Sequence, residues 1–234
     1  ERNRLLHRAV RLLWSLLRHP HRAQSKINRL KNVFLWSNKN ELKRTQNQGS
    51  WKDLFLIKRI LRREFGEFSA KIMFFNHHAC HIASVFDLSG LNEALVLSYD
   101  GGGEDLSTLL LYKDKSTTTE ILKEKWPNSL GHFYSFFTGY LGFRMLEDEY
   151  KVMGLAPYGK PIYRDVLLKE ILELKDNGRY KLNTTVVDYH DALQGSFGDG
   201  ISKLLGLPRR QGEPITDRHK NIAASVQAVF EEAV

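Results

Sequence analysis

The chain has 234 residues, of which 42% are hydrophobic and 26% charged, a composition typical of a globular protein. Its single cysteine, Cys80, excludes an intramolecular disulfide, and the sequence lacks the run of about 18 apolar residues that a membrane span needs. The net charge of +8 is unevenly distributed, because residues 1–71 hold 18 Lys and Arg against 5 Asp and Glu, a net +13, which leaves −5 for the remainder. This split argues against a uniformly basic nucleic-acid-binding protein and indicates a mildly acidic enzyme with a basic segment attached. The lone cysteine and the missing span make a cytoplasmic protein the expectation.

The N-terminal part of the chain is expected to be helical. Residues 2–36 place six apolar side chains on one helical face until Pro20 breaks the pattern, namely Leu5, Leu6, Val10, Leu13, Trp14 and Leu17. Such a basic amphipathic helix can bind an anionic membrane surface or a nucleic acid, but it more often packs on its own domain, and we favour the packed arrangement. A second helix is predicted from Trp51 to Phe65, with Gly66 as its C-terminal cap.

From Lys71 onward the sequence alternates between strand and helix patterns. We therefore assign residues 1–70 to a basic helical segment and residues 71–234 to an α/β domain with a mixed sheet flanked by helices. The expected strands are 71–76, 94–100, 107–114 and 118–126, and the expected helices are 77–86, 130–143, 161–174 and 221–234. Because the last helix carries no stop signal and the chain begins with Glu rather than Met, we expect an incomplete piece of a longer protein.

The sequence HHACH is a candidate metal site. His77 and His81 are four residues apart, so on a helix both imidazoles lie on one face and can reach one ion, while His78 and Cys80 point elsewhere. Such a pair by itself is more often two surface or hydrogen-bonded histidines. Asp100, at the end of the next strand, offers a third ligand beside a glycine-rich turn. Two histidines and a carboxylate suit iron, manganese or zinc.

The glycine-rich sequence DGGGE, from Asp100 to Glu104, lies between two predicted strands. This context excludes the Walker and dinucleotide-binding motifs, in which a helix follows the glycines. The three glycines Gly101, Gly102 and Gly103 would let backbone N–H groups approach phosphate oxygens, as in the hairpin phosphate loops of actin-like ATPases. A plain tight hairpin turn is the alternative.

A second polar segment, LEDEYKVMGLAPYGKP over residues 146–161, places acidic residues and Lys151 just before Gly154 and Pro157. The glycine and proline leave it too broken for one long helix. Lys151 could balance the charge of a phosphate, and solvated charges beside a loop are the alternative. The candidate nucleotide-binding residues are thus Gly101, Gly102, Gly103, Glu104 and Gly154.

Five segments in this order resemble the N-terminal domain of the carbamoyltransferase family: FFNHHACHIASVF, LSYDGGGE, SLGHFYSFFTGYLGF, DEYKVMGLAPYGKP and RHKNIAASVQAVFEEAV. That family includes nodulation-factor and antibiotic O-carbamoyltransferases. Its transfer domain is similar to those of the tRNA threonylcarbamoyl transferases and the hydrogenase-maturation carbamoyltransferases. The resemblance covers residues 50–234, and several linked motifs in order are more specific than any one of them.

The resemblance implies an actin-like ATPase fold, also called sugar-kinase-like, built from two ribonuclease-H-type halves with a nucleotide between them. It implies that His77, His81 and Asp100 bind a divalent metal, with iron expected, and that a fourth ligand, an aspartate, follows past Val234. This chain would then carry only part of the complete site.

The family reaction implied by the resemblance has two steps. A C-terminal domain makes carbamoyl-adenylate from ATP and carbamoyl phosphate, and the present domain passes the carbamoyl group to a hydroxyl of a sugar or natural product. In this scheme Asp100 holds a metal that polarises the carbamoyl carbonyl, the glycine backbone holds the phosphate, and Lys151 offsets the leaving-group charge. Neither a nucleic-acid partner nor a membrane span is expected. The alternatives are a tRNA threonylcarbamoyl transferase-like enzyme and a non-catalytic nucleotide-binding module.

Overall fold

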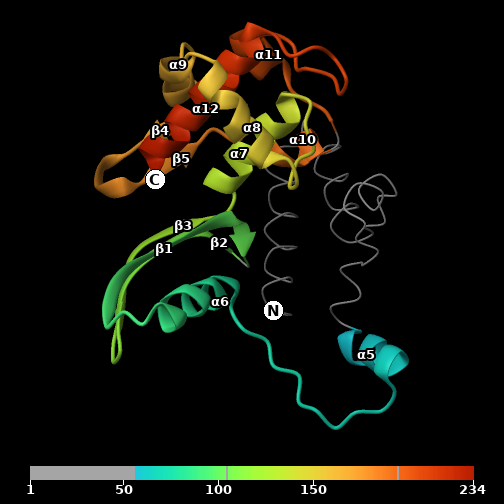
Figure 1. Cartoon of the computed structure of the whole chain (residues 1–234), viewed down its shortest axis with the longest axis vertical. Coiled ribbons are helices and arrows are strands. Elements are labelled where there is room, and N and C mark those ends of the chain that lie inside the picture. Colours follow the sequence, from blue (N-terminus) through green and yellow to red (C-terminus); the bar gives the residue numbers. More distant parts are fainter. Residues whose placement is uncertain (1–55, 104, 194) are drawn as a thin grey trace, which may run out of the picture. The chain divides into compact units, whose positions relative to one another are not determined.

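The computed structural model describes residues 56–103, 105–193 and 195–234 (Figure 1). The chain divides into two units, residues 1–72 and 73–234, and each has its own description here. The helix expected over residues 2–36 lies outside the described residues, so the assignment of residues 1–70 to a basic helical segment stays a prediction.

The described part of the first unit contains helix α5 (Ile57–Phe65). It ends at Gly66, whose φ of +75° lies in the left-handed region that favours glycine. The predicted helix and its glycine stop are therefore confirmed over the described residues.

The strand predicted over residues 71–76 is wrong. These residues form no regular element, and the side chains of Met73, Phe74 and Phe75 are 59%, 68% and 69% exposed. An apolar run becomes a strand only where another strand pairs with it, and the described part of the chain provides no such partner here.

The second unit is built on a three-stranded sheet of β1 (Glu93–Gly103), β2 (Leu106–Asp114) and β3 (Thr118–Lys125). The three predicted strands are confirmed, but both pairings are antiparallel, so the expected mixed sheet is wrong for the described residues. The reason is the short connections, because hairpin turns join strands only in the antiparallel sense. The β1–β2 register shifts between Tyr99 and Gly103, so the glycines lie at the irregular end of β1.

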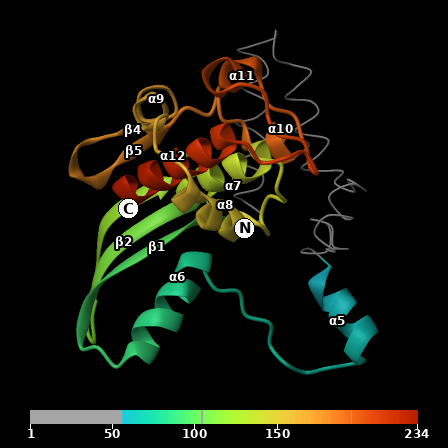
Figure 2. The same cartoon turned by 45° about the horizontal axis from the view of Figure 1, so that its top comes forward.

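One face of this sheet is covered by helix α6 (His77–Ile82) and the π-helical turn η2 (Ala83–Asp87) that continues it, as predicted (Figures 1 and 2). The contact forms a small hydrophobic core made of Ile82, Phe86, Val96, Leu109 and Leu111. These strand residues alternate along β1 and β2, so they lie on the face toward α6. The HHACH segment is therefore fixed to the sheet by Ile82 and Phe86, which follow it in the chain.

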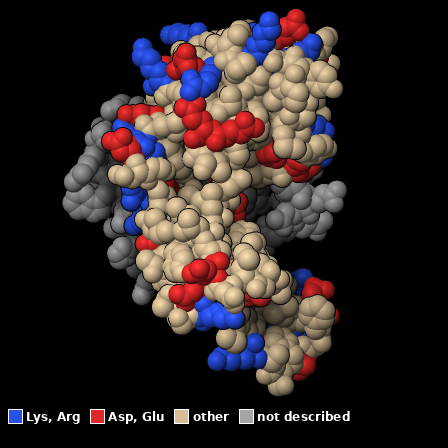
Figure 3. All heavy atoms as spheres, turned by 60° about the vertical axis from the view of Figure 1, so that its left-hand side comes forward, with Lys and Arg blue, Asp and Glu red and all other residues tan. Residues whose placement is uncertain are grey.

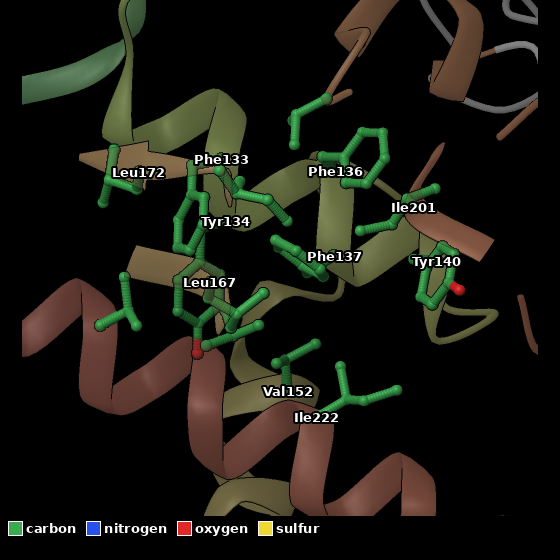
Figure 4. Close-up of a cluster of buried hydrophobic side chains, with 14 of the residues drawn as sticks. Phe133, Tyr134, Phe136, Phe137, Tyr140, Val152, Leu167, Leu172, Ile201 and Ile222 are labelled. Atoms are coloured by element: carbon green, nitrogen blue, oxygen red, sulfur yellow. The ribbon is translucent and has the colours of Figure 1, made fainter. Parts of the chain in front are cut away.

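A larger core holds the helices together (Figure 4). Its centre is α7 (Leu130–Tyr140), whose Phe133, Phe136, Phe137 and Tyr140 are at most 1% exposed. The long helix α12 (Asp217–Ala233) packs beside α7, and both helices confirm the predictions. The remaining helices of this layer are α8 (Glu149–Leu155), η3 (Ala156–Tyr158), α9 (Arg164–Glu170), α10 (Tyr189–Leu193) and α11 (Asp199–Leu205).

The helix predicted over residues 161–174 is only partly correct. It stops at Glu170, and the chain continues into β4 (Leu172–Leu174), which pairs across the turn η4 (Asp176–Gly178) with β5 (Tyr180–Leu182). Leu172 matches the helical pattern, but it lies in a strand, and its side chain is buried in the core from there. Pairing with the returning strand of a hairpin overrides local helix propensity here.

In the described part of the chain, no helix is long and apolar enough to cross a membrane. On the face drawn in Figure 3, acidic and basic side chains are interspersed, with wide uncharged areas between them.

Candidate functional site

Helix α6 presents its three histidines in two directions. The Asn76 side chain caps the helix by accepting a hydrogen bond from the Ala79 N–H (3.0 Å). His78 is fully buried, with Nδ1 2.8 Å from Ser98 Oγ and Nε2 3.2 Å from the Leu106 carbonyl oxygen. A carbonyl only accepts, so Nε2 of His78 carries a proton and this residue is a hydrogen-bonded core histidine. The sequence prediction that His78 points away from the pair is confirmed.

His77 and His81 turn toward Asp100 at the end of β1. His77 Nε2 lies 2.5 Å from Asp100 Oδ2, His81 Nε2 lies 3.4 Å from the same oxygen, and the two imidazole nitrogens are 3.0 Å apart. The other carboxylate oxygen, Oδ1, accepts the Gly101 N–H at 2.5 Å. Three potential ligand atoms from two elements thus converge on one point, the one such cluster in the described part of the chain.

The geometry and chemistry of this cluster fit a transition-metal ion. Ligands of one ion at bond lengths of about 2.0–2.2 Å stand roughly 3.0–3.5 Å from one another, which matches two of the three separations. Partial burial acts to raise the pKa of Asp100, but the hydrogen bonds from His77, the Gly101 N–H and His81 outweigh it and hold the pKa below its ordinary value. The carboxylate is therefore ionised at neutral pH, as a metal ligand must be. Two imidazoles and one carboxylate form the donor set of non-haem iron sites.

Each glycine after Asp100 packs against a different ring. A Cβ on Gly101 would stand 3.2 Å from His132 Cδ2, and one on Gly102 would stand 3.2 Å from Trp126 Cδ1. A Cβ on Gly103 would overlap His77, at 2.3 Å from Cδ2 and 2.5 Å from Cβ. Close packing of rings on the strand is therefore one reason for the triple glycine. The phosphate contact expected of these residues stays a prediction, and Glu104 lies outside the described residues.

The first turn of α7 abuts the same loop. Ser129 caps the helix by accepting the His132 N–H at 3.0 Å, and its hydroxyl donates to the Asp100 carbonyl at 2.9 Å. The indole of Trp126 donates to His132 Nδ1 (3.2 Å), and Tyr189 of α10 stacks on the His132 ring with centroids 3.6 Å apart. Sequence reasoning missed these neighbours of the site. The available signal was a serine directly before an apolar helix.

Lys151 and Gly154 lie on another element, α8, which packs on α7, α12 and η3. Lys151 Nζ is 2.9 Å from Asp148 Oδ1, and this hydrogen bond raises the pKa of the lysine above its ordinary value. A Cβ on Gly154 would meet no atom within 4 Å, so packing gives no reason for a glycine there. The structure thus brings together His77, His81 and Asp100 but does not bring the two α8 residues into the cluster.

Comparison with known proteins gives a consistent family match. A family model described as the carbamoyltransferase N-terminus matches residues 27–234. An uncharacterized protein of Synechocystis sp. is 40% identical over 186 residues, covering 76% of this chain and 30% of the relative. The nodulation protein NolNO of Sinorhizobium fredii is 36% identical over 181 residues, covering 76% of this chain and 25% of the relative. The nodulation protein NolO of Bradyrhizobium diazoefficiens is 36% identical over 159 residues, covering 68% and 27%. The chain therefore spans less than a third of the length of these three relatives.

Proposed function

The chain belongs to the carbamoyltransferase family, whose N-terminal part it matches, and from this premise we propose that it carries the transfer site of an O-carbamoyltransferase. The proposed donor is carbamoyl-adenylate, made from ATP and carbamoyl phosphate by an adenylate-forming domain of the full-length protein. The proposed acceptor is a hydroxyl of a sugar or natural product. For the complete domain we propose the actin-like fold, which the antiparallel β1–β2–β3 sheet followed by α7 supports.

The observation that carries this proposal is the convergence of His77, His81 and Asp100. These residues would hold the metal, with iron as the proposed ion because its non-haem sites use the same donor set. When bound, such an ion supplies Lewis-acid polarisation to a carbonyl oxygen. Two neighbouring features of the chain keep the ligands ready: the N-cap of α6 by Asn76, and the Gly101 N–H that holds the second oxygen of Asp100.

Binding of the phosphate and compensation of its charge during carbamoyl transfer are assigned to the chain's own polar groups. In the proposed step the bond between the carbamoyl carbon and the phosphate oxygen of AMP breaks, and a bond to the acceptor hydroxyl oxygen forms. AMP leaves with the electron pair, and the hydroxyl proton passes to solvent. Backbone N–H groups of Gly102 and Gly103 would bind the phosphate, and the charged Lys151 would offset the charge on AMP. A Cβ on Gly154 would meet no atom within 4 Å, so a ligand could approach the backbone of α8 there.

The test separates the two chemical steps in the full-length protein. With ATP and carbamoyl phosphate supplied, we expect Asp100→Ala to release pyrophosphate at the wild-type rate but to lose at least about 100-fold in carbamoylated product, because only transfer uses the metal site. The exposed Asp105 of the same hairpin provides the matched control, since Asp105→Ala removes a carboxylate outside the cluster.

Two results would count against this account. Full transfer activity in Asp100→Ala would remove the metal site from the mechanism. Loss of pyrophosphate release in a folded Asp100→Ala protein would instead contradict the division of the two steps between domains.

A further inference from the structure

We propose that Ser129 and Gly131, in the first turn of α7, are positioning residues that clamp the metal ligand Asp100. This inference rests on the proposed metal site and adds residues that belong to neither the ligand set nor the glycine sequence. The clamp acts on the backbone of Asp100 and thereby sets where its carboxylate points.

The first contact of the clamp is a hydrogen bond. Ser129 is fully buried, and its hydroxyl donates to the Asp100 carbonyl at 2.9 Å while its oxygen accepts the His132 N–H at 3.0 Å. One side chain thus joins the N-terminus of a helix to the backbone of a metal ligand 29 residues earlier. Removal of the Ser129 hydroxyl would leave the His132 N–H and the Asp100 carbonyl without this hydrogen-bond partner.

The second contact is steric. A Cβ on Gly131 would lie 2.6 Å from the Gly101 nitrogen and 2.7 Å from the Asp100 carbonyl carbon. Glycine inside a helix costs about 1 kcal/mol relative to alanine, and here it is the residue that lets the helix touch the Asp100–Gly101 peptide. Since these neighbours are backbone atoms, a methyl group would have to push the peptide away from α7.

The clamp matters because it ties one of the ligands to a second core. His77 and His81 belong to α6, which is attached to the small core through its own Ile82 and through Phe86 of the following turn η2. Asp100 is tied by Ser129 to α7, which lies at the centre of the large core. The distance between the imidazoles and the carboxylate therefore depends on the contact between α7 and the Asp100–Gly101 peptide as well as on the packing of α6 against β1.

The chain provides matched controls for both residues. Ser225 of α12 is also fully buried, accepts the Tyr163 N–H at 3.0 Å and donates to the Asn221 carbonyl, so its hydroxyl likewise accepts one backbone N–H and donates to one backbone carbonyl. Gly200 lies in α11, and a Cβ there would be 3.9 Å from Val186, an ordinary contact. Neither control belongs to the candidate site.

The experiment is a titration of metal-free full-length protein with Co²⁺, followed by its visible absorption, alongside thermal unfolding without metal. We expect Ser129→Ala and Gly131→Ala each to weaken Co²⁺ binding about 10- to 100-fold, the range for partners that orient a ligand, and to alter the spectrum of the bound ion. Ser225→Ala should lower the melting temperature about as much as Ser129→Ala and keep wild-type Co²⁺ affinity. Gly200→Ala should bind Co²⁺ like the wild type.

Wild-type Co²⁺ affinity in both Ser129→Ala and Gly131→Ala would overturn the clamp while leaving the metal site in place. An equal loss of affinity in the two controls would also overturn it, because the effect would then be general loosening. Absence of Co²⁺ binding in the wild type, or wild-type binding in His77→Ala, would overturn the metal site itself and the clamp with it.

Discussion

Adjacent histidines in the HHACH sequence have different roles because a helix turns them to different sides. His78 is buried and hydrogen-bonded, whereas the side chains of His77 and His81 are 41% and 51% exposed. We expect His78→Ala to cost about 2–5 kcal/mol in unfolding free energy, since it opens a cavity and leaves Ser98 and the Leu106 carbonyl unpaired. His81→Ala, the matched control on the same helix, should cost about 1 kcal/mol or less. Urea unfolding of metal-free protein measures both, and equal costs would contradict the two roles.

Gly103 is the residue at which the glycine sequence meets the metal site. Its missing side chain makes room for His77, so Gly103→Ala should displace that imidazole from Asp100. We expect loss of metal binding by at least about 10-fold, the range seen when a ligand loses its orientation. Gly198→Ala is the control, because a Cβ at Gly198 meets no atom within 4 Å. Metal content measured after equilibration with the ion distinguishes the two variants. A normal metal content in Gly103→Ala would contradict the prediction, because the His77 ring would then have kept its position as a ligand.

The candidate ligands could be predicted from the sequence, but the contacts that hold these ligands in position could not. A spacing of four on a helix places His77 and His81 on one face, and a carboxylate at a strand end completes the set. The contact of Ser129 with Asp100 joins residues 29 positions apart through a backbone carbonyl, and such a contact leaves no residue pattern. The packing of Gly103 on His77 is likewise invisible before the helix and the strand are placed together.

At the scale of elements, several polar side chains join the β4–β5 hairpin to the larger sheet. The Tyr180 hydroxyl lies 2.8 Å from Thr108 Oγ1 of β2, and Asn128, just after β3, makes the largest set of contacts. Asn128 donates to Glu124 Oε2 (2.9 Å) and to the Tyr180 carbonyl (2.7 Å), and its Oδ1 accepts the Leu182 N–H (2.7 Å). We expect Asn128→Ala to lower the unfolding free energy by about 1–3 kcal/mol, because buried backbone groups of β5 lose their partners. The exposed Asn92 is the control, and Asn92→Ala should be neutral within about 0.5 kcal/mol. Equal stability of the two variants would mean that the hairpin is held by its other contacts, such as those of Tyr180 with Thr108 and its apolar packing.

This hairpin also marks the limit of what local patterns predict. The antiparallel strands β2 and β3 and helix α7 follow from alternation and apolar periodicity, because each makes its decisive contacts with sequence neighbours or with one large core. Residues 172–174 become a strand only because Tyr180–Leu182 returns beside them, and residues 71–76 have no such partner among the described strands. In both cases the outcome depended on a pairing that a single segment does not encode.

At the scale of the molecule, the described second unit contains two hydrophobic cores. The ligand cluster lies between α6 and β1, which pack together in the smaller core, and α7 of the larger core contacts it through Ser129. A bound ion would therefore connect α6 to β1 by bonds stronger than the hydrogen bonds that now join them. Family membership rests on the match over residues 27–234, and the proposed chemistry rests on this cluster.

The most direct test of the account is the metal content of the purified full-length protein. One transition-metal ion per chain is expected in the wild type. The content should fall to background in His77→Ala and in His81→Ala, because each removes a ligand whose nitrogen lies within 3.4 Å of the Asp100 carboxylate. Elemental analysis with a parallel assay of protein concentration gives the ratio. An unchanged metal content in both variants would contradict the assignment of this cluster as the metal site.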